Sequence, residues 1–193
     1  MTTYILHGGE TSRDDPENEQ FFACFTKYVE KNEVKILMCY FTKEKEIWEK
    51  RLESDRKKIA KHTTKKVTLS LANDPEDLLE KLNTHDVLYV AGGNAQPLES
   101  YLPLFGSFKE KLKDKVYLGC SMGAFIVSSQ YVLTFDDQEN STVHKGLGLL
   151  PFSTLCHWNI EKKKEEKVGL LKEAAPNSPI LLLEECKFTT IIR

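Results

Sequence analysis

The chain lacks the features that mark several common classes of protein. Its five cysteines are widely separated, so neither a disulfide framework nor a zinc-ligand pair is indicated. No apolar run approaches the roughly 20 residues needed to cross a bilayer. The N-terminus, MTTYILHGGE, has neither the basic start nor the longer apolar region of a signal peptide. We therefore expect a cytoplasmic protein with no membrane partner.

A strong charge of one sign and a phosphate-binding loop are also missing. The formal net charge is −2 over 193 residues, so no global field favours nucleic acid. The charge-dense stretch 43–66 interleaves both signs, as on a solvated helix face, and we expect no nucleic-acid partner. Neither G-x-x-x-x-G-K-[ST] nor G-x-G-x-x-G occurs, which argues against a nucleotide phosphate loop.

The sequence does contain short apolar segments that alternate with segments of helical character. Continuous apolarity is typical of strands that are covered on both faces of a parallel sheet. The expected strands are 3–8, 34–41, 66–71, 86–93, 115–120, 180–185 and 188–192, and short strands and turns are expected in 131–152. The expected helices are 17–31, 43–62, 74–82, 96–113 and 161–173. This pattern predicts one α/β domain, residues 1–193, with a mostly parallel open sheet.

In open α/β sheets, ligands bind beyond the carboxyl ends of the strands. Three loops follow strands at that edge: HGGETSRDD (7–15), AGGNAQP (91–97) and GCSMGA (119–124). The third places Ser121 between two glycines, with an apolar strand before it and a helical segment, MGAFIVSSQ, after it. This is the context of a nucleophile elbow, although a serine that caps a helix on an ordinary turn would look the same.

A nucleophilic serine needs a base and donors for an oxyanion. Met122 N–H follows the serine, and the AGGN loop is the expected source of a second N–H. Of the five histidines, His7 ends the first strand at the ligand edge, and His157 follows an apolar segment, GLGLLPFSTLCHW. We select His157 as the base because a strand and Pro151 lead there into a loop.

Together, LGCSMGA, VAGGN and GLGLLPFSTLCHW resemble the aspartyl dipeptidase (dipeptidase E)/cyanophycinase family of serine peptidases. The order of elements agrees over most of the chain. The resemblance implies a three-layer, flavodoxin-like α/β fold, related to class I glutamine amidotransferases, with helices on both faces of the sheet. The chain departs from the family pattern at Ala91 and Met122, where glycine and alanine are usual, and at Cys186, where glycine follows the family's glutamate.

Carried over by motif, the resemblance makes Ser121 the nucleophile and His157 the general base. Gly93 and Met122 would supply the oxyanion-hole amides. The acid would be Glu185, or Glu184 if the register slips by one residue. Asp136 or Asp137, some 15 residues after the serine, is an alternative acid. Such a triad cleaves peptides through an acyl-enzyme and needs no metal or organic cofactor.

The resemblance implies small peptides as substrates, including those with an N-terminal aspartate. An acidic substrate group calls for a cationic partner, and we expect Arg13 in the first loop to supply it. Asn94, retained from the family's glycine loop, is a second candidate for substrate binding. A homodimer is a further expectation for this chain.

Three other functions fit parts of the same sequence. A protein that keeps the scaffold but only binds a ligand would explain Met122 and the uncertain acid. An α/β-hydrolase esterase would use the order Ser121, Asp136, His157, although few residues remain after the serine for that fold. A glutamine amidotransferase would need cysteine at the apex of the elbow, and Cys120 lies one position away.

Overall fold

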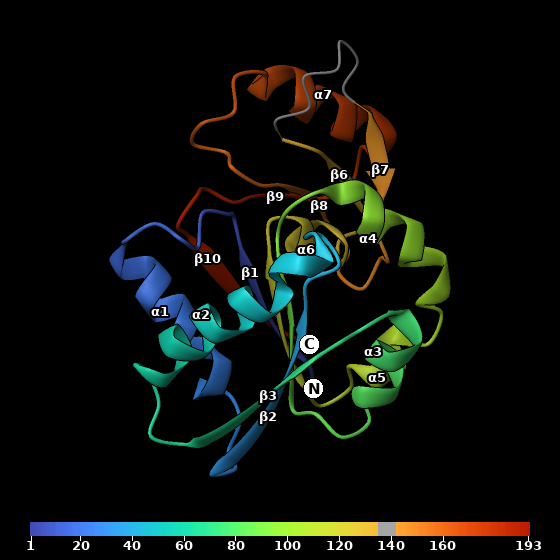
Figure 1. Cartoon of the computed structure of the whole chain (residues 1–193). Helices are drawn as coiled ribbons and strands as arrows, with labels where there is room; N and C mark the ends of the chain where they lie inside the picture. Colours follow the sequence, from blue (N-terminus) through green and yellow to red (C-terminus); the bar gives the residue numbers. More distant parts are fainter. Residues whose placement is uncertain (135–141) are drawn as a thin grey trace.

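The computed structural model describes residues 1–134 and 142–193, which form a larger and a smaller β-sheet (Figure 1). The larger sheet has the strand order β10-β1-β5-β4-β2-β3. Its neighbouring strands are parallel except for β10, which runs antiparallel to β1. The strands are β1 (Thr3–His7), β2 (Glu33–Cys39), β3 (Lys66–Leu71), β4 (Val87–Val90), β5 (Val116–Cys120) and β10 (Phe188–Ile192).

The helices that connect these strands begin at sequence signals that are easy to read. Asp15 accepts a hydrogen bond from the N–H of Glu17, and Asp74 accepts one from the N–H of Asp77. A proline follows each cap, where the missing N–H costs nothing. The principal helices are α1 (Pro16–Lys27), α2 (Trp48–Ala60), α3 (Pro75–Lys81), α4 (Ala95–Tyr101) and α7 (Lys164–Ala174), and a 3-10 turn (Lys45–Ile47) precedes α2.

Helices cover both faces of the larger sheet, so the predicted α/β architecture is confirmed. Figure 1 shows α1 and α2 on one side of the sheet and α3 with α5 (Phe108–Lys111) on the other. The strands β4 and β5 are buried along their whole length, as their continuous apolarity predicts. This burial holds the carboxyl ends of the central strands in fixed positions at one edge.

The second half of the chain builds the smaller sheet, of order β7-β6-β8-β9. Its strands are β6 (Gln130–Val132), β7 (Val143–Lys145), β8 (Ser153–Leu155) and β9 (Ile180–Leu182). The predicted strand 180–185 is too long, because β9 ends at Leu182 and the chain turns through Glu184–Lys187 into β10. That turn brings the last two strands into different sheets.

The predicted helix 96–113 is wrong as a single element. It consists of α4, a 3-10 turn (Leu102–Leu104) and α5. Pro103 lies at the start of the 3-10 turn, where it lacks an N–H and its ring collides with the carbonyl four residues earlier in an α-helix. Gly106 then weakens any continuation before α5.

The predicted helix after the elbow is also shorter than expected. α6 (Met122–Phe125) is a single turn. The β-branched Ile126 and Val127 follow, and the Ser128 hydroxyl donates to the carbonyls of Phe125 and Gln130 at 2.6 and 3.0 Å. Serine side chains that bond to nearby backbone in this way compete with helical hydrogen bonds. A long helix dipole therefore does not assist the elbow.

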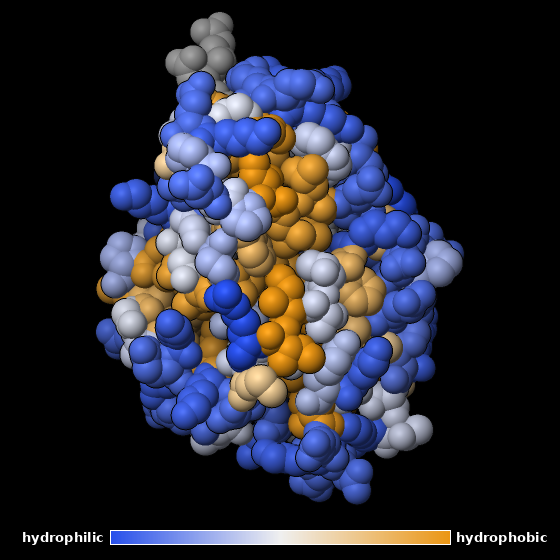
Figure 2. Space-filling view, turned by 180° about the vertical axis from the view of Figure 1, so that it is seen from behind, coloured by the Kyte–Doolittle hydropathy of each residue, from blue (hydrophilic) through white to orange (hydrophobic). Residues whose placement is uncertain are grey.

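Hydrophobic side chains also reach the surface. Figure 2 shows a band of hydrophobic residues down the middle of the face opposite to that of Figure 1. The exposed large hydrophobic residues include Leu182 of β9 and Ile192 of β10, at 40% and 57% exposure. The homodimer stays a prediction. In the described part of the chain, no helix has the length and apolarity to cross a bilayer.

Candidate active site

Ser121 follows β5 in a strained backbone conformation. Its φ of 47° and ψ of −104° lie outside the regions that side-chain-bearing residues favour. The Ser121 N–H donates to the His7 carbonyl at 2.8 Å, and the Ser121 carbonyl accepts from the N–H groups of Ala124 and Phe125. These bonds hold the sharp strand-to-helix turn that the elbow motif predicts.

The two glycines of the elbow are required by close packing. A β-carbon on Gly119 would lie 2.4 Å from the Gly123 carbonyl oxygen, and one on Gly123 would lie 2.2 Å from the Val90 carbonyl oxygen. Both distances are far shorter than a carbon–oxygen contact. The G-x-S-x-G spacing therefore lets the elbow pack against itself and against β4.

His157 comes to the serine from the smaller sheet, in the loop after β8. Its Nε2 lies 3.0 Å from Ser121 Oγ. The His157 N–H donates to the Gly8 carbonyl at 3.1 Å, and the ring lies so close to Gly9 that a β-carbon there would fall 2.1 Å from Cε1. The imidazole thus packs against Gly9, and Gly8 holds the backbone of His157.

Glu185 lies on the other side of the imidazole, in the turn between β9 and β10. Its Oε1 is 2.9 Å from His157 Nδ1, and its side chain is 4% exposed. Burial raises the pKa of the Glu185 carboxyl. The hydrogen bonds from His157 and Arg13 lower it by more than burial raises it, so the pKa lies below its usual value. An ionised carboxylate accepts from Nδ1–H, which favours the tautomer whose Nε2 is a hydrogen-bond acceptor.

Of the other candidate acids, Glu184 is the one that the structure describes, and its carboxylate is not the one bonded to His157 Nδ1. Glu184 is exposed, and only its backbone takes part in the turn, where its carbonyl oxygen packs against Gly8. Asp136 and Asp137 lie outside the described residues. Within LLLEECKF, the carboxylate that contacts His157 in the described structure is therefore that of Glu185.

The predicted oxyanion donors face the same cavity as the serine. Gly93 and Met122 both line it, and in residues 1–134 and 142–193 neither N–H forms a hydrogen bond. Gly93 has a φ of 146°, which favours glycine, and a β-carbon there would lie 2.5 Å from the Thr42 carbonyl oxygen. Two unpaired amides beside a serine are suited to a developing oxyanion.

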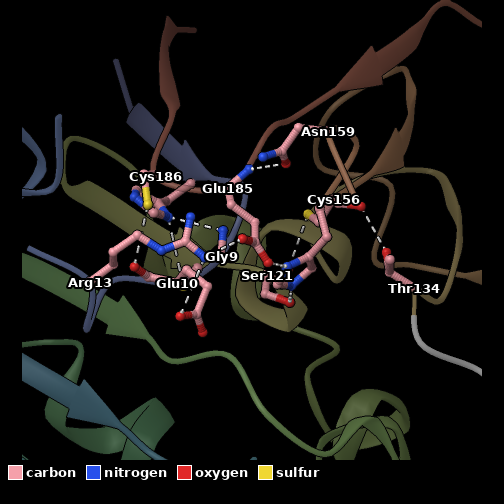
Figure 3. Close-up of polar contacts among 12 residues, drawn as sticks. Gly9, Glu10, Arg13, Ser121, Thr134, Cys156, Asn159, Glu185 and Cys186 are labelled. Atoms are coloured by element: carbon pink, nitrogen blue, oxygen red, sulfur yellow. Dashed lines mark hydrogen bonds and ion pairs between the residues drawn. The ribbon is translucent and has the colours of Figure 1, made fainter. Parts of the chain in front are cut away.

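The remaining predicted site residues lie elsewhere. The Arg13 guanidinium donates to Glu185 Oε2 at 2.7 Å (Figure 3). Asn94 caps α4, where its Oδ1 accepts from the N–H of Gln96 at 3.1 Å, so the amide is occupied by a structural bond. Neither residue lines the cavity at the serine.

Two cations that sequence reasoning missed line this cavity of about 400 Å³. Lys43 follows β2, so the rule that selected the other loops would have found it. Arg51 lies on α2, the helix that follows the loop of Lys43. Burial and then the charge of Arg51 lower the pKa of the Lys43 ammonium. Glu10 and Asp55 lie near enough to act on the charges of Lys43 and Arg51, respectively. In the described part of the chain, Arg51 Nε is buried without a hydrogen-bond partner.

The sequence pattern of peptidase family S51 matches residues 4–192, nearly the entire chain. The chain belongs to peptidase family S51. An uncharacterized peptidase of Listeria monocytogenes serovar 1/2a is 35% identical over 113 residues, which are 54% of this chain. That match spans 55% of the relative's length. The resemblance stated from the three motifs is confirmed.

Solved structures share the fold of this S51 chain. A peptidase from an acI-B1 actinobacterium superposes with a TM-score of 0.70 at 16% identity, covering 99% of this chain and 83% of that one. A "Putative Peptidase E Protein" from Listeria monocytogenes EGD-e gives 0.63 at 20% identity, covering 100% and 99%. At these identities the likeness establishes the α/β fold.

Two of the departures from the family pattern, Met122 and Cys186, have a clear place in the structure of this S51 chain. Met122 is 1% exposed and packs within the hydrophobic core, and it also lines the cavity at the serine. Cys186 has a φ of 60°, in the left-handed region, which explains why the family prefers glycine there. Among the described residues, no group of three or more histidine, cysteine, aspartate or glutamate side chains could hold a metal ion.

His7 has a structural position in this S51 chain. Its Nε2 lies 2.8 Å from Asn18 Oδ1, and its Nδ1 accepts from the Gly9 N–H at 3.0 Å. Burial lowers the pKa of His7 to about 4, although the hydrogen bond to Asn18 opposes the shift. The neutral imidazole thus supports the glycine loop on which His157 rests.

This depressed pKa predicts a pH-dependent stability. Between pH 6.5 and 4 the unfolded chain binds a proton at His7 and the folded chain does not. The free energy of unfolding should therefore fall as the pH falls through this range, by about 3 kcal/mol from this residue. Urea unfolding of wild type and His7→Gln at several pH values measures the difference, and parallel curves would contradict the prediction.

Proposed function

We propose that this chain is a serine peptidase that cleaves short peptides through an acyl-enzyme. One observation carries the proposal: Ser121 Oγ, His157 and Glu185 form an unbroken line of contacts of 3.0 and 2.9 Å, which opens on a cavity. A helix cap does not need a buried histidine and carboxylate behind the serine. Membership of the S51 family supports the same reaction class.

The geometry supports the following steps. As Ser121 Oγ attacks the peptide carbonyl carbon, His157 Nε2 takes the hydroxyl proton, and Glu185 stabilises the imidazolium through Nδ1–H. The N–H groups of Gly93 and Met122 bind the oxyanion. His157 then gives its proton to the leaving amine. Water, activated by the same imidazole, attacks the ester and releases the acid product and free serine.

The cavity supports a short substrate with an acidic residue at the cleavage site. A volume of about 400 Å³ suits one or two residues of a peptide. Lys43 and Arg51 provide two cationic groups on its wall, and an anionic ligand would relieve their mutual repulsion. Glu10 also lines the cavity, which suits the α-ammonium of an N-terminal residue. An N-terminal aspartate combines both groups.

Selectivity for the acidic side chain can be measured with paired substrates that begin with aspartate or asparagine. In Arg51→Gln and Lys43→Gln, kcat/KM should fall about 10- to 100-fold for the aspartyl substrate, since a charged hydrogen bond is lost. It should fall less than threefold for the asparaginyl one. Arg56 of α2, which pairs with Glu53 on the surface, offers a matched control in Arg56→Gln. Equal losses on both substrates would overturn the assignment.

The reaction class itself is tested by a fluorophosphonate probe, which labels activated serines. Wild type should acquire one adduct on Ser121, located by mass spectrometry, and Ser121→Ala should acquire none. A wild type that stays unlabelled while correctly folded would overturn the peptidase proposal and favour a binding protein on the same scaffold. Equal labelling of the two proteins would place the reactive serine elsewhere.

A further inference from the structure

Both oxygens of the Glu185 carboxylate are in use. Oε1 is 2.9 Å from His157 Nδ1, and Oε2 is 2.7 Å from Arg13 Nη2. Figure 3 shows the guanidinium directed at the carboxylate from the first loop. The Glu185 side chain is 4% exposed and that of Arg13 is 50% exposed. The carboxylate therefore bridges a buried imidazole and a guanidinium that reaches in from the surface.

The backbone that carries Arg13 is anchored to the core. Asn18, which is 2% exposed, donates from Nδ2 to the carbonyls of Glu10 and Arg13 at 2.9 and 2.8 Å. Its Oδ1 accepts from His7 Nε2. Its Nδ2 also lies 3.7 Å from Cys186 Sγ, and a buried amide with four partners has little freedom to move. The loop that carries Arg13 therefore has its backbone anchored to the core beside Glu185.

The carboxylate is also held from its own backbone. The Glu185 N–H donates to Asn159 Oδ1 at 2.8 Å, and the next residue, Cys186, donates its N–H to the Gly9 carbonyl at 3.0 Å. These bonds hold the backbone of the turn. They do not restrict the side-chain torsions of Glu185. Among the described residues, Arg13 is the one that hydrogen-bonds to the outer oxygen, Oε2.

We propose that Arg13 is a positioning residue of the catalytic triad, which holds the Glu185 carboxylate ionised and oriented toward His157. The proposal rests on the serine peptidase function. An arginine fork is suited to this task because it is always charged and its donors have a fixed geometry. Without it, a flexible glutamate would sample orientations in which Nδ1–H loses its acceptor, and fewer molecules would have His157 ready to take the serine proton.

This role differs from the substrate contact that the sequence suggests for Arg13. A substrate carboxylate would have to compete with Glu185, whose charge-assisted bond to Arg13 is already short, and with Glu10, 3.9 Å away. The cavity at Ser121 is lined by Lys43 and Arg51 and not by Arg13. In this proposal Arg13 positions the Glu185 carboxylate, and Lys43 and Arg51 bind the charge of the substrate.

The test compares Arg13→Gln, Arg13→Lys and the surface control Arg56→Gln. We expect kcat to fall about 10- to 100-fold in Arg13→Gln, with KM for aspartyl and asparaginyl substrates changed less than threefold. Arg13→Lys should recover part of the loss, because it keeps the charge but not the fork. Arg56→Gln should match wild type. Thermal melting of each protein shows that it is folded at the assay temperature.

Two outcomes overturn the proposal. An unchanged kcat in Arg13→Gln would mean that the contact has no role in the reaction. A rise in KM confined to the aspartyl substrate would assign Arg13 to substrate binding. The rate of fluorophosphonate labelling separates this from failure of the peptidase function: an unlabelled wild type defeats the function, whereas a labelled wild type with an equally fast Arg13→Gln defeats only the role of Arg13.

Discussion

Replacing Ser121 by alanine should lower kcat for peptide hydrolysis by about 10⁴- to 10⁶-fold, the range in which a triad nucleophile is lost. The substitution removes the atom that forms the acyl-enzyme and leaves the oxyanion amides and the cavity in place. Substrate should therefore still bind, and its affinity should change little. Stopped assays with a dipeptide panel measure the rate, and calorimetric titration of the inactive variant measures the affinity.

The stability of Ser121→Ala serves as its control. Ser121 has a φ of 47°, and alanine meets the same steric cost as serine there, so the melting temperature should stay close to that of wild type. Residual hydrolysis within tenfold of wild type would contradict the assignment of Ser121 as the nucleophile. A lost activity together with a collapsed melting curve would call for Ser121→Cys, which keeps a nucleophilic atom at the same place.

Replacing Glu185 by glutamine should lower kcat by about 10³- to 10⁴-fold, because the amide can donate to Nδ1 and favour the wrong tautomer of His157. The change is close to isosteric, so the fold should persist. Glutamine also breaks the ion pair with Arg13 and leaves that guanidinium without its buried partner. A modest loss of stability should accompany the loss of rate, and urea unfolding measures it.

The neighbouring residue provides the matched control for this variant. Glu184 is exposed, and Glu184→Gln removes the same charge one position away. Its kcat should lie within twofold of wild type. A large loss in Glu184→Gln with little effect in Glu185→Gln would mean that the turn is shifted by one residue in the working enzyme. Equal small effects would indicate that the acid lies elsewhere, with Asp136 and Asp137 the next variants to make.

Much of the fold follows from local pattern. The central strands β4 and β5 are continuous apolar runs, and the helix caps at Asp15 and Asp74 are read from adjacent residues. Two predicted helices were too long. Pro103 ends the first after α4, and the Ser128 side chain competes for backbone hydrogen bonds after the elbow. The division of the last strands between two sheets depends on pairings with β1 and β8, which are distant in sequence.

The elbow at Ser121 could be predicted because its chemistry is local. A strand, two glycines that avoid carbonyl collisions at 2.4 and 2.2 Å, and a following N–H all lie within a few residues. His157 and the glutamate pair could be named from motifs. Their distances from the serine could not, because they depend on the smaller sheet: His157 lies in the loop after β8, and the turn that carries Glu185 begins after β9.

The partners of the charged residues in the site could not be predicted from the sequence. A residue's position in the chain says which loop carries it, and on that basis Arg13 was the natural partner for an acidic substrate. The direction of a long side chain depends on the nearest opposite charge, and for Arg13 that is Glu185, 172 residues away. Lys43 and Arg51 were left to face the cavity. Reaction class is thus encoded in short motifs, whereas the partner of each charge emerges only when distant loops meet at one sheet edge.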